Sequence, residues 1–203
     1  MMLGRVAHTL YWMQRYRERA ENTARCLNVN MLLGMDLPYY QEKQWYPMIQ
    51  VAGDEEGFAQ RYAEPNEANV VEFLTFDREN PNSIVSCLAH ARENARQVRE
   101  TITSEMWNEL NTVYLFVDDI HRNRSKMAIS FQLYNRITRQ CQLFTGIADT
   151  TMSRTDAWHF GRMGALLERA DMTSRLLDVK YFMLLPSPQA VDSPFDNIQW
   201  SAL

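Results

Sequence analysis

Three observations predict an all-α protein, a helical bundle of about five to seven helices. Apolar residues recur at the three- and four-residue spacing of helices over long stretches. No segment shows the alternation of apolar and polar residues that is typical of a half-buried strand. The 203 residues contain only 7 Gly and 7 Pro, which favours long helices over many turns. At this length we expect one domain, residues 1–203, with its own core.

The first expected helix covers about residues 4–33. Its apolar side chains fall at helical spacing, and Gly34 offers a natural stop. This face consists of Leu10, Met13, Ala20, Ala24, Leu27 and Met31. The pattern weakens over residues 34–65, where we expect a loop-rich excursion with one or two short helices.

The middle of the chain predicts two or three helices. Asn66 can cap a helix that ends before Pro81, because its side chain can accept a bond from a free backbone N–H. Ser83 then opens a long apolar pattern that runs through Leu115. We expect a break within this pattern, with Ser104 capping the second segment.

Two further long helices are expected, one over roughly residues 124–149 and one that begins at Ser153 or Thr155 and ends at Pro186. We expect the second to carry its apolar residues on one face. That face consists of Phe160, Met163, Leu167, Ala170, Thr173 or Ser174, Leu177, Tyr181 and Leu184. Residues 196–203 are similar to the first two turns of another helix, capped by Asp196 or Asn197.

Composition and charge exclude several function classes. The net charge of −4 argues against a nucleic-acid partner. The one basic cluster, residues 121–126, follows shortly after Asp118 and Asp119, so we interpret it as a solvated helix junction. No stretch approaches 18 apolar residues, and the N-terminus lacks the apolar core of a signal peptide. We therefore expect a cytoplasmic protein that does not enter membranes.

Residues for metal binding and nucleophilic catalysis do not occur in recognisable patterns. Cys26, Cys87 and Cys141 lack short spacings, which predicts buried free thiols in a reducing compartment. None of the four histidines follows a glutamate by three residues, as a di-iron bundle requires. There is no glycine-rich phosphate loop and no Gly-x-Ser-x-Gly motif. We expect no metal and no cofactor.

A charged segment occurs twice in the chain. Residues 18–27 return 150 residues later as residues 168–177, with six of ten positions identical. In each copy an acid precedes an arginine by four residues, which favours a pair within the helix. Glu18 and Arg19, however, are neighbours that point about 100° apart around the helix. Each must therefore find its partner on another element.

The repeat indicates where those partners lie. If the two helices pack about a local two-fold axis, each glutamate meets an arginine of the other helix: Glu18 with Arg169 or Arg175, and Glu168 with Arg19 or Arg25. Two interpretations stay open. The charges form buried reciprocal ion pairs that fix helix register, or they line a polar cavity that holds a carboxylate or phosphate with the arginines as forks.

Several blocks of the sequence resemble the bacterial alpha-E domain family, an all-helical family named for its Glu-Arg motif. The blocks lie in residues 15–25, 73–84, 91–111 and 151–178, and the resemblance covers residues 4 to about 185. Members of the family are longer, so the resemblance implies a fragment that lacks the C-terminal third.

The resemblance also implies a functional context. Genes for such domains tend to lie beside genes for an unusual ATP-grasp ligase and a transglutaminase-like protease. We therefore expect a non-catalytic binding or scaffold component of a system that forms and cleaves peptide or amide bonds. An anionic peptide is the expected ligand, and a homo-oligomer is a further expectation. The alternative is an enzyme of unknown reaction that uses paired Glu and Arg in a polar cavity.

Overall fold

The computed structural model describes residues 2–36, 45–123, 131–183 and 200. Regular structure in these ranges is entirely α-helical, which confirms the predicted fold class. Four long helices form the centre: α1 (Gly4–Asp36), α5 (Ile84–Gln97), α6 (Ser104–Arg122) and α7 (Phe131–Thr151). None of the described helices combines the length and apolar character that a membrane crossing requires.

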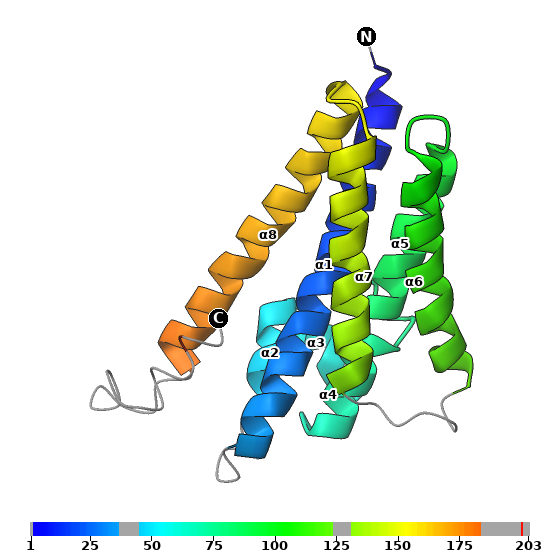
Figure 1. The fold of residues 1–203 in the computed structure, drawn as a ribbon. Coiled ribbons are helices and arrows are strands. Elements are labelled where there is room, and N and C mark those ends of the chain that lie inside the picture. Colours follow the sequence, from blue (N-terminus) through cyan, green and yellow to red (C-terminus); the bar gives the residue numbers. More distant parts are fainter. Residues whose placement is uncertain (1, 37–44, 124–130, 184–199, 201–203) are drawn as a thin grey trace.

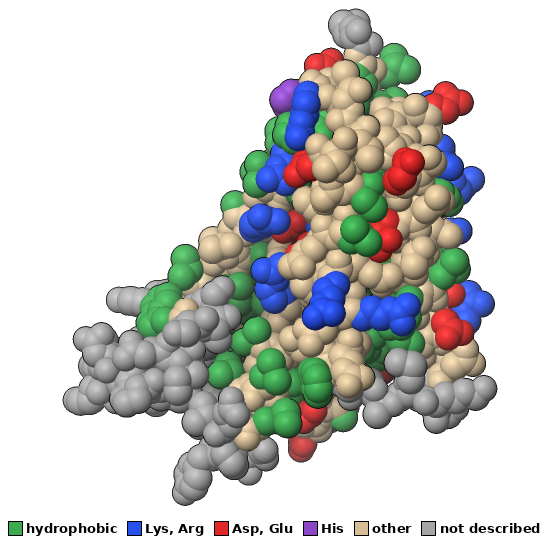
Figure 2. Space-filling model, in the orientation of Figure 1, with side chains coloured by type: hydrophobic (Ala, Val, Ile, Leu, Met, Phe, Trp, Pro, Cys, Tyr) green, Lys and Arg blue, Asp and Glu red, His purple; other side chains and the backbone are tan. Residues whose placement is uncertain are grey.

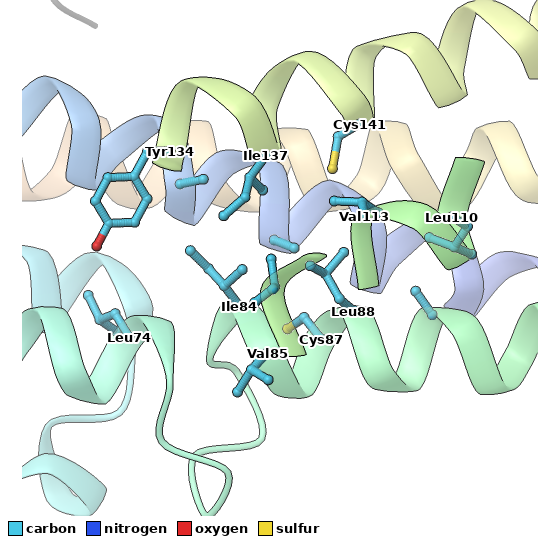
Figure 3. Packing of buried hydrophobic residues seen from close by; sticks show 14 of the residues in the cluster. Leu74, Ile84, Val85, Cys87, Leu88, Leu110, Val113, Tyr134, Ile137 and Cys141 are labelled. Atoms are coloured by element: carbon cyan, nitrogen blue, oxygen red, sulfur yellow. The ribbon is translucent and has the colours of Figure 1, made fainter. Parts of the chain in front are cut away.

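These four helices close a ring around one core. α1 packs on α5, α5 on α6, α6 on α7, and α7 returns to α1. Successive members run in opposite directions, as in an up-and-down four-helix bundle (Figure 1). Their apolar faces meet inside the ring, where Ile84, Leu88, Val113 and Ile137 are almost completely buried (Figure 3). Burial of these faces is the main source of stability.

A fifth long helix, α8 (Asp156–Met183), lies outside the ring and packs along α1. It runs in the same direction as α1 (Figure 1). Three short helices, α2 (Tyr46–Ala52), α3 (Glu55–Ala59) and α4 (Glu67–Thr75), gather near the C-terminal end of α1, and α2 also contacts α8. α1 is thus surrounded by α5, α7 and α8.

Eight helices are described, one more than the upper bound expected, and two of them are the short helices expected in the excursion over residues 34–65. The Asn66 side chain caps α4 as predicted. Ser83, where the long apolar pattern was expected to open, caps α5. The prediction for Ser104 is wrong, since Thr103 caps α6 by accepting the Met106 N–H at 3.3 Å. Two adjacent hydroxyl residues offered the same capping chemistry, and only the first has the extended backbone that a cap requires.

One helix end lies later in the chain than predicted, and several other predicted helix ends lie outside the described residues. α1 continues past Gly34 to Asp36, so the predicted stop at Gly34 is wrong. A single glycine within a packed helix costs only about 1 kcal/mol, which tertiary contacts outweigh. The first residues of the helix predicted over 124–149 lie outside the described residues, as do the end at Pro186 and all of the segment 196–203 except Trp200.

The predicted apolar face of α8 lies on the outside of the bundle. Phe160, Met163, Leu167 and Leu177 are 39–48% exposed and point away from the bundle. The side of α8 that faces α1 carries small residues and a buried charge instead: Ala157, Gly161, Gly164, Ala165 and Glu168. Small residues allow the two helix backbones to approach closely, and the larger apolar residues are left on the outside.

Candidate functional site

Two ion pairs connect α1 and α8 at the level of the repeated segment. Arg169 donates from Nε to Glu18 Oε1 at 2.8 Å, and Arg19 donates from Nε to Glu168 Oε1 at 2.6 Å. The two pairs are equivalent, because position 169 corresponds to 19 and position 168 to 18. The helices are therefore neighbours related by a local two-fold axis, and each glutamate meets an arginine of the other helix.

The same symmetry governs the closest approach of the two helices, one to two turns before the ion pairs. A Cβ on Gly164 would lie 2.2 Å from the carbonyl oxygen of Tyr11, and a Cβ on Gly161 would lie 3.4 Å from Cγ of Gln14. Tyr11 corresponds to Gly161 and Gln14 to Gly164. This contact holds the helices at a distance at which the glutamates and arginines can reach one another.

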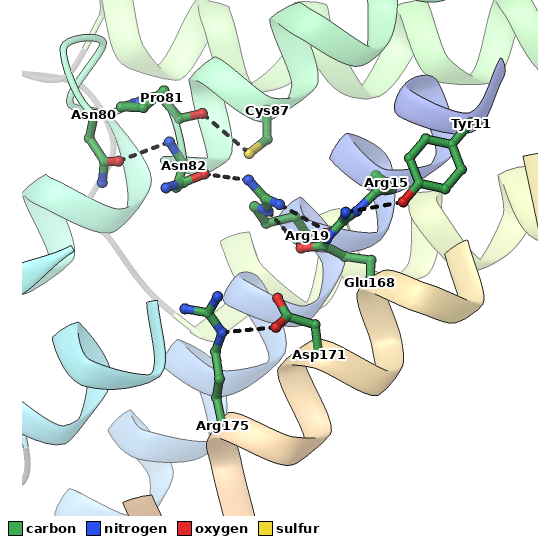
Figure 4. A network of polar contacts seen from close by, with 10 residues as sticks. All are labelled: Tyr11, Arg15, Arg19, Asn80, Pro81, Asn82, Cys87, Glu168, Asp171 and Arg175. Atoms are coloured by element: carbon green, nitrogen blue, oxygen red, sulfur yellow. Dashed lines mark hydrogen bonds and ion pairs between the residues drawn. The ribbon is translucent and has the colours of Figure 1, made fainter. Parts of the chain in front are cut away.

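Glu168 is the centre of the first cluster of charges. Its side chain is 2% exposed and accepts bonds from both Arg19 and Arg15, the latter at 2.6 Å from Nε. Arg15 also donates to the Tyr11 hydroxyl at 3.1 Å, and Arg19 donates to the side-chain oxygen of Asn82 (Figure 4). Two arginines thus surround one buried carboxylate, and Asn82 connects the cluster to the loop before α5.

Arg17 is the centre of the second cluster and is only 1% exposed. It donates from Nη2 to Glu18 and from Nη1 to Glu21, both at 2.7 Å, and from Nε to Gln14 at 3.1 Å. Arg169 completes the cluster by donating to the second oxygen of Glu18. A fully buried guanidinium with three acceptors is satisfied, as burial of a charge requires.

The remaining two candidates pair within their own helices. Arg25 donates to Glu21 at 2.7 Å, and Arg175 donates to Asp171 at 3.2 Å. The Arg175 guanidinium also lies over Gly53, where a Cβ would come within 1.9 Å of its Nη1 and where φ is +72°. The left-handed φ favours glycine at this position, since the end of the Arg175 side chain could move away from a Cβ. The six residues predicted from the repeat therefore divide into four that link the helices and two that do not.

Sequence reasoning missed four members of the clusters: Gln14, Arg15, Arg17 and Asn82. The positions in α8 that correspond to Arg15 and Arg17 are Ala165 and Leu167, so these arginines break the repeat. A signal existed for Arg17, which precedes Glu21 by four residues. Nothing in the sequence marked Asn82, because its contact depends on how the loop folds against α1.

A groove of about 400 Å³ opens beside the second cluster, between α1, α7 and α8. Its apolar lining includes Met172 and Leu176, and its polar lining includes Thr145 and Thr173. Arg25 and Arg169 belong to its wall, and their side chains are 53% and 50% exposed. Figure 2 shows basic side chains over this face of the molecule. The groove therefore combines apolar surface with two accessible positive charges.

The profile of the Alpha-E family, described as a predicted alpha-helical domain with a conserved ER motif, matches residues 2–203. The chain belongs to the Alpha-E family. The Glu-Arg pairs that link α1 and α8 are two copies of such a motif within this Alpha-E domain. No curated protein and no solved structure matches the chain.

The charges of the second cluster fix the protonation state of Glu18. Burial alone would raise the pKa of this carboxyl group, but the neighbouring Arg17 and the hydrogen bond from Arg169 outweigh burial and hold the pKa below its usual value. Glu18 is therefore an anion at neutral pH. General acid–base catalysis works best with a pKa near the operating pH, so the electrostatics of the Alpha-E domain favour an ion-pairing role for Glu18.

This lowered pKa predicts a loss of stability in acid. A depressed folded-state pKa contributes stability that is fully present above the unfolded value, about 4.5, and is lost as the pH falls through the folded value. We expect the free energy of unfolding to fall below about pH 4.5. Chemical denaturation across pH 7 to pH 3 measures it. The Glu18→Gln variant should show a shallower pH dependence; an unchanged slope would contradict this origin.

The thiols of the Alpha-E domain do not form an activated nucleophile. Burial raises the pKa of both Cys87 and Cys141 to about 12, so neither carries appreciable thiolate at neutral pH. Cys26 is half-buried, and all three thiols are free. In the described ranges, no three His, Cys, Asp or Glu side chains gather where they could hold a metal ion.

Proposed function

We propose that this Alpha-E domain is a non-catalytic binding or scaffold component of a bacterial, cytoplasmic system that forms and cleaves peptide or amide bonds. Its partners would be an ATP-grasp ligase and a transglutaminase-like protease, and its ligand an anionic peptide. Burial of the Cys87 and Cys141 thiols, which raises their pKa to about 12, argues against nucleophilic catalysis by these residues and so supports a binding role.

The observation that carries the proposal is the groove walled by Arg25 and Arg169. Among the described residues, Arg169 uses only Nε for a carboxylate, and Arg25 uses only Nη2. Each guanidinium has five N–H donors, so several remain for a ligand. The buried glutamates keep both arginines in place, which reduces the entropy that a ligand must overcome when it binds.

The lining of the groove indicates the chemical class of the ligand. Guanidinium groups bind carboxylates through two parallel hydrogen bonds. Met172 and Leu176 supply apolar surface, and Thr145 and Thr173 supply hydroxyl groups that suit a peptide backbone. Its volume of about 400 Å³ lies in the range typical of ligand sites. A peptide end or side chain with a free carboxylate fits these features.

Calorimetry with short peptides tests whether the groove binds an anionic peptide. We expect a tripeptide that ends in glutamate to bind by calorimetry, and its C-terminal amide to bind more weakly. The Arg25→Gln variant should bind the free acid about 10- to 100-fold more weakly, because a charge-assisted bond is lost. Arg175→Gln is the matched control, since Arg175 occupies the equivalent position in α8 but lies over Gly53. Equal binding by both variants would contradict the proposal.

Co-purification tests whether the domain binds the proposed ligase and protease. Tagged domain expressed with the neighbouring ligase and protease should yield a complex, and mass spectrometry should identify bound peptide. The variants Glu18→Gln and Glu168→Gln distinguish the scaffold from the alternative enzyme. Loss of fold or of partner binding supports the scaffold. An intact complex that no longer forms product would instead favour catalysis by the paired glutamates.

A further inference from the structure

The outward face of α8 carries a continuous apolar stripe. Phe160, Met163, Leu166, Leu167 and Leu177 are between 39% and 48% exposed. They are five of the thirteen large hydrophobic side chains exposed in the described part of the chain, and they fall within eighteen residues. Figure 2 shows apolar side chains along the edge of the molecule where α8 lies. Such a concentration on one element indicates an interaction surface.

The spacing within the stripe shows what kind of element can cover it. The alternating steps of three and four residues run through Phe160, Met163, Leu167, Ala170, Ser174 and Leu177. This spacing is typical of the contact line, or seam, between two helices packed side by side. At 1.5 Å per residue, the seam is about 26 Å long. A helix is therefore the element that fits this face.

The sizes of the side chains show that a second copy of α8 fits in antiparallel orientation. With the two-fold axis midway along the seam, Phe160 faces Leu177, Met163 faces Ser174, and Leu167 faces Ala170 of the other copy. In the two inner layers a large residue then opposes a small one, which fills the interface. A parallel pair would place Ala170 and Ser174 each opposite itself and leave those layers poorly filled.

We propose that the α8 stripe is the dimer interface of this protein, formed by antiparallel packing of α8 on α8 of a second copy. The interface is isologous, so it closes after two copies. α1 packs on the opposite side of α8, which places the two bundles on opposite sides of the helix pair. Around the helix axis, the groove residue Arg169 lies roughly a third of a turn from the seam and Met172 roughly half a turn from it, so the groove remains open in each copy.

Analytical ultracentrifugation of the whole chain measures the dimer. We expect a concentration-dependent dimer, and we expect Leu167→Glu to weaken it about 100-fold because each dimer would bury two unpaired carboxylates. The matched control is Leu143→Glu on α7, which is equally exposed but off the stripe and should leave the dimer unchanged. Circular dichroism checks that both variants fold. A monomer at all concentrations, or equal weakening by both variants, would overturn the proposal.

Cysteine crosslinking tests whether the two copies of α8 pack antiparallel or parallel. A mixture of Met163→Cys and Ser174→Cys chains should form a disulfide under mild oxidation. Either variant alone should not, because like positions lie about 16 Å apart along an antiparallel pair, beyond disulfide reach. Wild-type protein controls for the three native cysteines. Crosslinking of each variant with itself would indicate a parallel pair and overturn the antiparallel interface.

Discussion

Replacing Arg17 with Met is expected to lower the free energy of unfolding by about 3–5 kcal/mol, the cost of removing one partner from a buried ion pair. Arg17 is 1% exposed and neutralises Glu18 and Glu21, which are equally buried. Methionine fills much of the same volume but leaves both carboxylates with one arginine each. Urea denaturation followed by circular dichroism measures the change.

A second variant identifies the cause of this loss. If the loss of stability comes from Glu18 and Glu21 losing Arg17 as a partner, adding Glu21→Gln to Arg17→Met should restore part of the free energy of unfolding, because one buried negative charge is removed. If the loss came from packing alone, the second substitution would lower stability further. An Arg17→Met variant as stable as the wild type would show that the bundle does not depend on the buried cluster.

Replacing Gly164 with Ala is expected to destabilise the protein by about 1–3 kcal/mol, the usual range for overpacking. The new Cβ would lie 2.2 Å from the Tyr11 carbonyl oxygen, so α1 and α8 must separate. Backbone atoms cannot rotate away as a flexible side chain can. Separation would also lengthen the Glu18–Arg169 and Glu168–Arg19 bonds, so thermal unfolding should occur at a lower temperature.

Gly146 provides the matched control for this substitution. It also lies within a long helix, α7, but a Cβ there would meet no atom within 4 Å. Gly146→Ala should therefore stabilise the protein by about 0.5–1 kcal/mol, the helix-propensity difference between the two residues. If both substitutions stabilise the protein, the close approach of α1 and α8 at Gly164 is absent in solution.

The cross-pairing of α1 and α8 could be predicted because it rests on helix geometry and on the repeated charged segment. Glu18 and Arg19 point about 100° apart, so each needs a partner elsewhere, and the repeat supplied one in Arg169 and Glu168. Arg17 could not be placed in the same way. A long basic residue is usually exposed, and this one is buried only in the assembled bundle, where it lies against Phe144 of α7.

The orientation of α8 could not be predicted from periodicity, because the helix is apolar on more than one side. Its large apolar residues suggested the inward face. The structure places the small residues Gly161, Gly164 and Ala165 inward instead. Which side faces inward depends on how closely α1 approaches, and that distance is a property of two helices together.

The packing of α8 on α1 has a consequence for how the chain folds. α1 is synthesised before α8, and the partner of Glu18 lies about 150 residues later in the chain. Closing so long a loop carries an entropic cost before the contact is made, and contacts between distant residues slow folding. Until α8 arrives, Glu18 lacks Arg169, and one side of α1 remains open to chaperones. We therefore expect α1 to assemble with α5 and α7 first, and docking of α8 to be the late step.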